Sequence, residues 1–279
     1  MKKYAQLIRV KHWVKNILIF LPVICAKIIT IENVVKTTLG FFAFSFMCSF
    51  VYIINDIRDI EKDKLHERKK NRPLPCGKIK KGSACIIAFV LLVCSFILNM
   101  IVNDKIFSVA TGFLIFYMLI NLAYSFGMKN FAIIDILLLA SGFILRVYYG
   151  AAIIDVEVSD WLFLTILNAS LFLGLGKRKK ELVENKYTRA VLEAYNEAFL
   201  DKFQYLTLAL TLVFYSMWTT EQHIKYLFLT IPLVMVIFMR YCLIIEKSEE
   251  GDPTTILYED KFLVILCIIY SISMIWLLR

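Results

Sequence analysis

Long apolar segments limit the fold of this sequence more than any other feature. Nine of them stand between polar stretches, at about 16–31, 37–54, 84–102, 106–125, 131–153, 159–176, 203–220, 223–245 and 262–278. A helix that crosses a membrane needs about 20 predominantly apolar residues. Hydrophobic residues make up 59% of the chain, which is more than the roughly half that is usual in soluble domains. The sequence therefore predicts an all-α integral membrane protein with about nine transmembrane helices, in one polytopic domain over residues 1–279.

The polar loops set the expected orientation. The long loops cover about 55–82, 177–202 and 246–261, and the Lys and Arg residues concentrate in the first two. Because positively charged loops stay on the cytoplasmic side, we expect these loops and the N-terminus to face the cytoplasm from a cell inner (plasma) membrane. Orientation and anionic ligands then explain the net charge of +9, and nucleic acid is not an expected partner.

The most informative polar stretch directly follows the second apolar segment. At about 100° per residue, Asn55, Asp59 and Asp63 fall on one stripe of a helix, and Asp56 lies beside them. Carboxylates this close repel each other unless a cation lies among them, and Mg²⁺ prefers oxygen ligands and shares its shell with phosphates. The spacing predicts a Mg²⁺ site formed by these four side chains. The alternative is a solvated acidic helix end paired with Arg58, Lys62 and Lys64.

A basic loop comes next in the sequence. Its cations are Arg68, Lys69, Lys70 and Arg72, and Pro73 follows the last of them. Proline fixes the chain in an extended turn, and a guanidinium held there can bind a phosphate through two hydrogen bonds. An acidic face beside a basic loop suits a diphosphate ester; the alternative for Arg72-Pro73 is a purely structural turn.

Polar residues also precede the first apolar segment. Lys15 and Asn16 border that segment and are candidates to reach a phosphate. Arg9 and Lys11 are expected to anchor an interfacial helix, with Trp13 at the level of the lipid headgroups.

Two ionisable residues lie inside the fifth apolar segment. Asp135 and Arg146 are 11 residues apart, about 16 Å of helix rise, so they cannot pair within one straight helix. Because charges inside a membrane span are costly, each is expected to find a partner on another helix or on a ligand. At the end of the sixth segment, Lys177 and Arg178 follow two glycines that would let the backbone approach a ligand, and both cations are candidates to hold a phosphate.

The order Asn55-Asp56-x-x-Asp59-x-x-x-Asp63 resembles the first aspartate-rich motif of the UbiA prenyltransferase superfamily, and the likeness covers nearly the whole chain. The resemblance implies nine transmembrane helices around a central cavity open to the cytoplasm, with the acidic motif at that end. Members that transfer prenyl groups often carry paired acids four residues apart in a second motif. Here Leu139 stands at the second position and Asp135 is alone.

One branch of the superfamily, the decaprenyl-phosphate phosphoribosyltransferases, is similar at more positions. The shared stretches are Lys11-His12-Trp13-Val14-Lys15-Asn16, Tyr52 to Asp56, Arg72-Pro73, Tyr124-Ser125 with Lys129, Asp135 with Ala140 to Arg146, Gly176-Lys177-Arg178, and Gly251-Asp252-Pro253-Thr254. The resemblance implies an enzyme that transfers 5-phosphoribose from phosphoribosyl diphosphate (PRPP) to a polyprenyl phosphate, with Mg²⁺ and release of pyrophosphate. The expected catalytic residues are Asp56, Asp59, Asp63 and Asp135. The expected substrate-binding residues are Lys15, Asn16, Asn55, Lys69, Lys70, Arg72, Tyr124, Lys129, Arg146, Lys177 and Arg178.

Two other functions share these features. An aromatic prenyltransferase, which uses a prenyl diphosphate to make quinone or haem precursors, would have the same fold and first motif. A transporter or lipid-binding scaffold would use the same polar cavity, but acids at a cytoplasmic edge beside a basic loop favour an enzyme. The seven cysteines show no metal-ligand spacing and are expected to be reduced and structural. Acceptor chain length and homo-oligomer formation are left open.

Overall fold

The computed structural model describes residues 2–65, 69–183, 190–247 and 253–279, so Arg68, Gly251 and Asp252 lie outside the described residues. Contacts between Cα atoms divide the chain into two compact units. The first unit comprises Met1–Leu21, Thr30–Gly127 and Leu145–Asp155. The second unit comprises Pro22–Ile29, Met128–Ile144 and Val156–Arg279. The single domain expected from the sequence stays a prediction.

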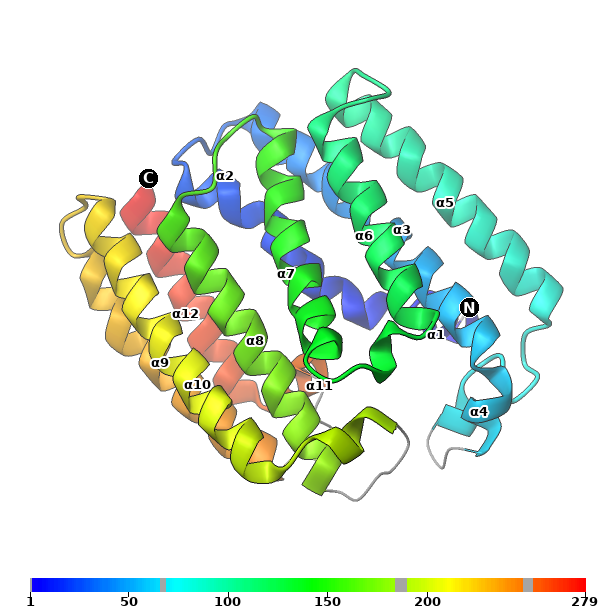
Figure 1. Cartoon of the computed structure of the whole chain (residues 1–279). Coiled ribbons are helices and arrows are strands. Elements are labelled where there is room, and N and C mark those ends of the chain that lie inside the picture. The colour runs from blue at the N-terminus through cyan, green and yellow to red at the C-terminus, as the bar shows by residue number, and fades with distance from the viewer. Residues whose placement is uncertain (1, 66–68, 184–189, 248–252) are drawn as a thin grey trace. The chain divides into compact units, whose positions relative to one another are not determined.

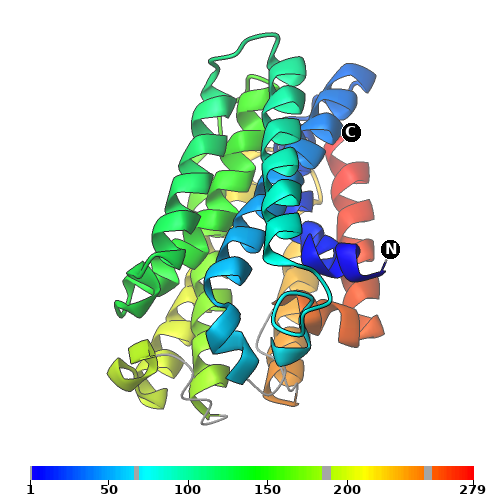
Figure 2. The same cartoon turned by 90° about the vertical axis from the view of Figure 1, so that its right-hand side faces the viewer.

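The first unit is built around one long helix, α3 (Ile31–Arg58). This helix packs against α5 (Lys81–Asn103), α6 (Val109–Ser125) and the 3₁₀ helix η1 (Val10–Phe20), and α3 and α5 lie side by side (Figures 1 and 2). The shorter elements of this unit are α1 (Lys2–Leu7), α4 (Ile60–Leu65), η2 (Lys69–Asn71) and the second half of α7 (Ile134–Ile153).

The core of the first unit consists of large apolar side chains from these helices. Phe44 and Met47 of α3, Leu114 of α6 and Tyr149 of α7 are all fully buried. Thr30 begins α3 with a cap, because its side-chain oxygen accepts the backbone N–H of Asn33 (3.2 Å).

The first predicted span, 16–31, is not one continuous α-helix. The chain forms η1 up to Phe20, continues as the short helix α2 (Leu21–Cys25), and is non-helical until α3 begins. In a 3₁₀ helix, residues three apart share a face, and Trp13 and Asn16 use that face to bind α3. Trp13 Nε1 donates to Ser49 Oγ (3.0 Å), and Asn16 Nδ2 donates to Ser45 Oγ (2.8 Å). The segment that forms η1 instead of an α-helix is thus the segment that makes these hydrogen bonds to α3.

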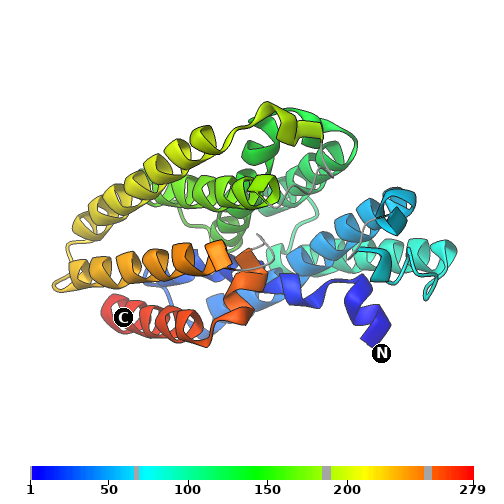
Figure 3. The same cartoon turned by 90° about the horizontal axis from the view of Figure 1, so that it is seen from below.

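The second unit contains two pairs of neighbouring helices. The helices α8 (Asp160–Val183) and α9 (Glu197–Glu221) pack along each other, as do α10 (Thr230–Lys247) and α12 (Lys261–Leu278), and Figure 3 shows both pairs. The remaining elements are most of α2, η3 (Met128–Asn130), the first half of α7, η4 (Ala190–Ala194), η5 (Leu227–Leu229) and α11 (Pro253–Glu259).

Eight of the nine predicted apolar segments each correspond mainly to one α-helix: α3, α5, α6, α7, α8, α9, α10 and α12. The segment 223–245 also includes η5, which precedes α10. Among the described residues, five helical stretches are long and apolar enough to cross a membrane: Ile31–Arg58, Lys81–Asn103, Ile134–Ile153, Leu227–Glu246 and Lys261–Leu278. The apolar helix Val109–Ser125 is shorter. An all-helical membrane fold is therefore confirmed, whereas nine membrane crossings and their orientation stay predictions.

The second polar loop begins later than the sequence predicts. The loop was expected from residue 177, but α8 continues to Val183. Arg178 pairs with Asp135 of α7 and with Glu181 in the next turn of α8, and these ion pairs stabilise the extra helical turns. The cations at the end of α8 are consequently held on a helix rather than on a loop.

Candidate active site

Two acidic side chains at the end of α3 and in α4 share one cationic partner. Arg72 Nη1 donates to Asp56 Oδ1 (3.2 Å) and to Asp63 Oδ2 (2.8 Å). The Asp56 side chain is only 4% exposed, and that of Asp63 is 6% exposed. Buried carboxylates need a positive partner or hydrogen bonds, because burial disfavours their charge. The pair therefore marks a place in the first unit where the chain holds a cation between two acids.

The turn after η2 holds Arg72 in this position. Cys76 N–H donates to the Arg72 carbonyl (3.1 Å), and Ile79 N–H donates to the Pro73 carbonyl (3.1 Å). Leu74 and Ile79 are buried in an apolar cluster with residues of α1, α3 and α5. The Arg-Pro turn is thus anchored in the core, while the Arg72 side chain remains 31% exposed.

The four expected metal ligands do not converge as predicted. Within the described ranges, no group of three or more Asp, Glu, His or Cys side chains is placed to hold a metal ion. The α-helix ends at Arg58, and Asp59 leaves the helical conformation (φ −91°, ψ 10°), so the predicted stripe is interrupted there. What the structure brings together is Asp56 and Asp63, with the Arg72 guanidinium between them. Carboxylate oxygens that already share a cation fit the ligand preference of Mg²⁺.

Arg9 is a member of this site that the sequence reasoning assigned to membrane anchoring. Its Nη2 donates to Asp56 Oδ1 (2.5 Å), and its guanidinium lies 4.7 Å from the centre of the Tyr52 ring. The side chain is only 17% exposed. Its position next to the first apolar segment suggested headgroup contact, and no local pattern links it to an aspartate 47 residues away.

Arg146 lies in a buried polar cluster of the first unit. Its Nε donates to Asn16 Oδ1 (2.7 Å), and its Nη2 contacts Tyr117 OH (3.3 Å) and Cys48 Sγ (3.5 Å). Cys48 precedes Asp56 by eight residues, about 12 Å along α3. The expectation that Arg146 finds its partner on another helix is confirmed. These contacts do not support a direct role for Arg146 or the fully buried Asn16 in binding a phosphate, and those roles stay predictions.

Asp135 lies in the corresponding buried network of the second unit. Arg178 Nε donates to Asp135 Oδ2 (2.5 Å), and Tyr195 OH donates to Asp135 Oδ1 (2.6 Å). Arg178 also pairs with Glu181. The side chains of Asp135 and Arg178 are both fully buried. Asp135 therefore finds its partner on another helix, as the sequence predicts, and orients the Arg178 guanidinium. Its catalytic role stays a prediction.

Tyr195 completes this network and was not found from the sequence. Its hydroxyl accepts the backbone N–H of Ile133 (2.5 Å) while it donates to Asp135. Burial, followed by the hydrogen bond to Asp135, raises the pKa of Tyr195 well above its ordinary value. The hydroxyl therefore donates to the carboxylate at neutral pH, as a protonated tyrosine does. Tyr195 lies outside the apolar segments, in a stretch without a recognisable motif, so the sequence offered no signal for it.

The glycines before Lys177 serve helix packing rather than ligand approach. A Cβ at position 174 would lie 3.2 Å from the Ile136 side chain of α7, and one at position 176 would lie 2.7 Å from Gln204 Nε2 of α9. Both glycines therefore let other helices of the second unit approach α8, and this corrects the role expected for them.

The other predicted residues are at least partly exposed, and all except Lys15, in the middle of η1, lie near the ends of helices. In the first unit, Lys15, Asn55, Asp59, Lys69 and Tyr124 are partly exposed and Lys70 is exposed; in the second unit, Lys129 and Lys177 are partly exposed.

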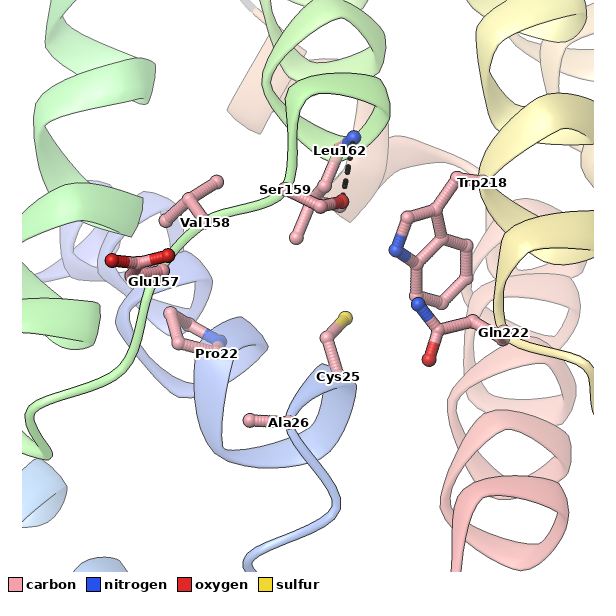
Figure 4. A pocket seen from close by; sticks show the side chains of 9 residues that line it. All are labelled: Pro22, Cys25, Ala26, Glu157, Val158, Ser159, Leu162, Trp218 and Gln222. Atoms are coloured by element: carbon pink, nitrogen blue, oxygen red, sulfur yellow. Dashed lines mark hydrogen bonds between the residues drawn. The ribbon is translucent and has the colours of Figure 1, made fainter.

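A small cavity lies at the opposite end of α8 from Arg178. It has a volume of about 80 Å³, and Cys25, Glu157, Ser159, Trp218 and Gln222 are among the residues that surround it (Figure 4). Sites for small molecules usually measure about 300–1,000 Å³. This cavity is too small for the expected substrates, and it lies away from the charged network of the second unit.

The all-helical membrane fold and the paired acids and arginines together define a class of protein: a membrane-embedded protein that holds charged groups at the ends of its helices. The profile of the UbiA prenyltransferase family matches residues 19–274, so the chain belongs to that family. It is accordingly an enzyme, a transferase, and the resemblance found in the sequence is confirmed.

Three relatives illustrate the match. The decaprenyl-phosphate phosphoribosyltransferase of Corynebacterium glutamicum is 30% identical and covers 94% of this chain and 82% of its own length. The enzyme of the same name from Mycolicibacterium smegmatis is 29% identical and covers 93% of this chain and 87% of its own length. The structure of a UbiA homologue from Archaeoglobus fulgidus bound to GPP and Mg²⁺ matches with a TM-score of 0.72 and 20% identity. The match covers 98% of this chain and 99% of that chain. This last likeness establishes the fold.

Proposed function

We propose that this enzyme transfers the 5-phosphoribosyl group of PRPP to a polyprenyl phosphate of the decaprenyl-phosphate type, in a Mg²⁺-dependent reaction that releases pyrophosphate. The named relatives support this choice, because the similarity extends over 94% of the chain. We further propose that the reaction takes place at the cytoplasmic face of the plasma membrane, where the water-soluble donor is available.

The observation that carries the choice of donor is that Asp135 is buried and already hydrogen-bonded to two side chains. A clamp for a prenyl diphosphate would use a second acidic motif, but Asp135 is enclosed by Arg178 and Tyr195, and Leu139 replaces a second acid. One acidic cluster, the pair Asp56 and Asp63, then remains to hold the Mg²⁺ that would bind the diphosphate. A donor with one diphosphate and one separate phosphate matches one acidic cluster with additional cations.

In the proposed reaction, the bond between ribose C1 and the pyrophosphate oxygen breaks, and the electron pair leaves with pyrophosphate. An oxygen of the lipid phosphate forms the new bond to C1, so that a single displacement inverts this carbon. Mg²⁺, held by Asp56 and Asp63 with Asp59 and Asn55 nearby in sequence, would neutralise charge on the diphosphate. Oxocarbenium character develops at C1, as in other glycosyl transfers.

The chain's own residues supply position and charge. Arg72 and the neighbouring Lys69 and Lys70 are proposed to stabilise the departing pyrophosphate, where negative charge grows. Lys129 and Lys177 are proposed ligands for the 5-phosphate and the lipid phosphate, and Arg178, fixed by Asp135, holds the backbone beside Lys177 in place. The lipid phosphate is already an anion at neutral pH, so no general base is required.

A direct comparison of substrates tests this proposal. Purified full-length protein in detergent or nanodiscs receives radiolabelled PRPP with decaprenyl phosphate, or a prenyl diphosphate with 4-hydroxybenzoate, each with Mg²⁺. We expect label in the lipid fraction from PRPP only, and loss of this transfer with EDTA. Consumption of the prenyl diphosphate alone would show that the protein is an aromatic prenyltransferase instead.

A further inference from the structure

Two arginines approach the acidic pair from different parts of the chain. Arg9 Nη2 lies 2.5 Å from Asp56 Oδ1, while Arg72 Nη1 lies 3.2 Å from the same atom and 2.8 Å from Asp63 Oδ2. Two guanidinium charges thus match two buried carboxylate charges. A divalent cation carries the same total charge as the two guanidinium groups and prefers the same carboxylate oxygens.

The chain fixes Arg9 on α3 through a single serine. The buried hydroxyl of Ser49 donates to the Ile8 carbonyl (2.7 Å) and lies 3.0 Å from the indole N–H of Trp13, which donates to it. Residues on both sides of Arg9 are thereby tied to α3. Between them, Arg9 adopts a left-handed backbone conformation (φ 53°, ψ 48°), which is unfavourable for a residue other than glycine. Anchoring at the membrane surface would require none of these contacts.

The guanidinium of Arg9 is also well suited to a second partner. It lies over the face of the Tyr52 ring, 4.7 Å from the ring centre, where a cation is attracted by the aromatic face. Guanidinium groups bind phosphate oxygens through two parallel hydrogen bonds. Arg9 and Arg72 can therefore turn from carboxylate oxygens to diphosphate oxygens with little movement of the backbone.

We infer that Arg9 and Arg72 are internal counter-cations of the acidic pair. Before substrate binds, the two arginines pair with Asp56 and Asp63. When a divalent ion binds these two acids, the arginines release them and bind the donor's diphosphate instead. The inference rests on the proposed function of this same site. Arg9 then acts as a substrate-binding residue that couples metal binding to diphosphate binding. When the ion binds alone, it competes with the two arginines for the carboxylates of Asp56 and Asp63. When diphosphate is present, the arginines bind the diphosphate, so the ion no longer has to displace them from the carboxylates.

Binding of Mn²⁺, used in place of Mg²⁺, tests this coupling without turnover. Electron paramagnetic resonance measures free Mn²⁺ during titration of the detergent-purified full chain, with and without pyrophosphate. Wild-type protein is expected to bind Mn²⁺ weakly alone and more tightly with pyrophosphate. Arg9→Gln should tighten binding of Mn²⁺ alone by at least about fivefold and reduce the effect of pyrophosphate by a similar factor, since coupling is reciprocal.

Arg58→Gln is the matched control. Arg58 is at the same end of α3, but it donates to the Ser125 carbonyl and stacks on Phe126. It should leave both Mn²⁺ titrations unchanged. If Arg9→Gln does not fold, as judged by size-exclusion chromatography, Arg9→Lys replaces it: this variant keeps the charge but loses the planar donors, and it should reduce the pyrophosphate effect.

The outcomes separate this inference from the proposed function. If Arg9→Gln behaves like Arg58→Gln, or weakens Mn²⁺ binding equally with and without pyrophosphate, Arg9 is structural and the inference is wrong. Asp63→Asn should abolish Mn²⁺ binding whether or not the arginines exchange. Retention of Mn²⁺ binding by Asp63→Asn would instead contradict the proposed metal site itself.

Discussion

Asp135 and Arg178 form an ion pair in which neither side chain is exposed, with Oδ2 and Nε 2.5 Å apart. Asp135 lies in the first turn of α7 and Arg178 near the end of α8, so the pair joins two helices of the second unit. Removing two charges from water costs several kcal/mol for each ion, and their attraction offsets this only when the remaining hydrogen bonds are made. Tyr195 and Glu181 make those bonds.

Replacing Asp135 should therefore destabilise the protein as well as reduce transfer. Asp135→Asn leaves the buried Arg178 charge without its only fully buried carboxylate partner among the described residues, and we expect a loss of about 3–5 kcal/mol. The double variant Asp135→Leu with Arg178→Met should recover much of this stability but not activity. Thermal unfolding in detergent measures the first effect. Equal unfolding temperatures for wild type and Asp135→Asn would show that the pair does not hold α7 to α8.

Local spacing explains which parts of the site could be predicted. Asp56 and Asp63 are seven residues apart, about two helical turns, so a common face follows from the sequence. Arg9 reaches Asp56 across 47 residues, and Tyr195 reaches Asp135 across 60 residues. Such pairs depend on how separate elements pack, which no periodic pattern records. The end of α3 at Asp59 also could not be predicted, because it depends on the conformation of one residue, and a metal site formed by all four residues stays a prediction.

The fold was predictable to a similar extent. Apolar length alone located eight helices, because segments of this length must satisfy their backbone groups internally. It did not reveal η1, since an apolar stretch has the same composition whether it forms a 3₁₀ helix or an α-helix. The hydrogen bonds from Trp13 and Asn16 to α3 hold that element, and they become visible only when α3 is in place.

The acidic pair predicts a sharp difference between two neighbouring acids of α4. Asp63 is buried against Arg72, whereas Glu61 is exposed and pairs with Lys64. Asp63→Asn should lower Mg²⁺-dependent transfer from PRPP by about 100-fold or more, the effect expected when a group that stabilises developing charge is lost. Glu61→Gln should retain near-normal transfer. Equal activities of the two variants would place the metal site elsewhere.

Arg146 should contribute to stability rather than to donor binding. Its hydrogen bonds to Asn16 and Tyr117 are buried, and removing one partner leaves polar groups unsatisfied at about 1–3 kcal/mol each. Arg146→Met is expected to unfold at a lower temperature than wild type while its KM for PRPP changes little. A large rise in KM at unchanged stability would instead restore the role in phosphate binding expected from the sequence.

Asp260 should make stability depend on pH at the start of α12. The hydrogen bond from Arg240, together with the backbone N–H of Leu263, lowers the pKa of Asp260 below its ordinary value of 3.8. A lowered pKa in the folded state means that the stabilisation is present above the ordinary pKa and is lost as the pH falls through the folded value. Asp260→Asn should therefore unfold at a lower temperature than wild type at pH 7. The difference should shrink as the pH approaches 3; a constant difference would contradict this cause.

Two glycines of the first unit should respond in opposite ways to the same substitution. A Cβ at position 150 would collide with the Ile19 carbonyl of η1, whereas one at position 112 of α6 meets no atom within 4 Å. Gly150→Ala should cost about 1–3 kcal/mol through overpacking, because the obstacle is backbone. Gly112→Ala should be neutral or stabilise the protein by up to about 1 kcal/mol, since alanine favours helices. Thermal unfolding of both variants tests the contact, and a stable Gly150→Ala protein would show that η1 does not pack against α7 as described. Because η1 directly follows Arg9, the destabilised variant should also lose part of its transfer activity, which Gly112→Ala should retain.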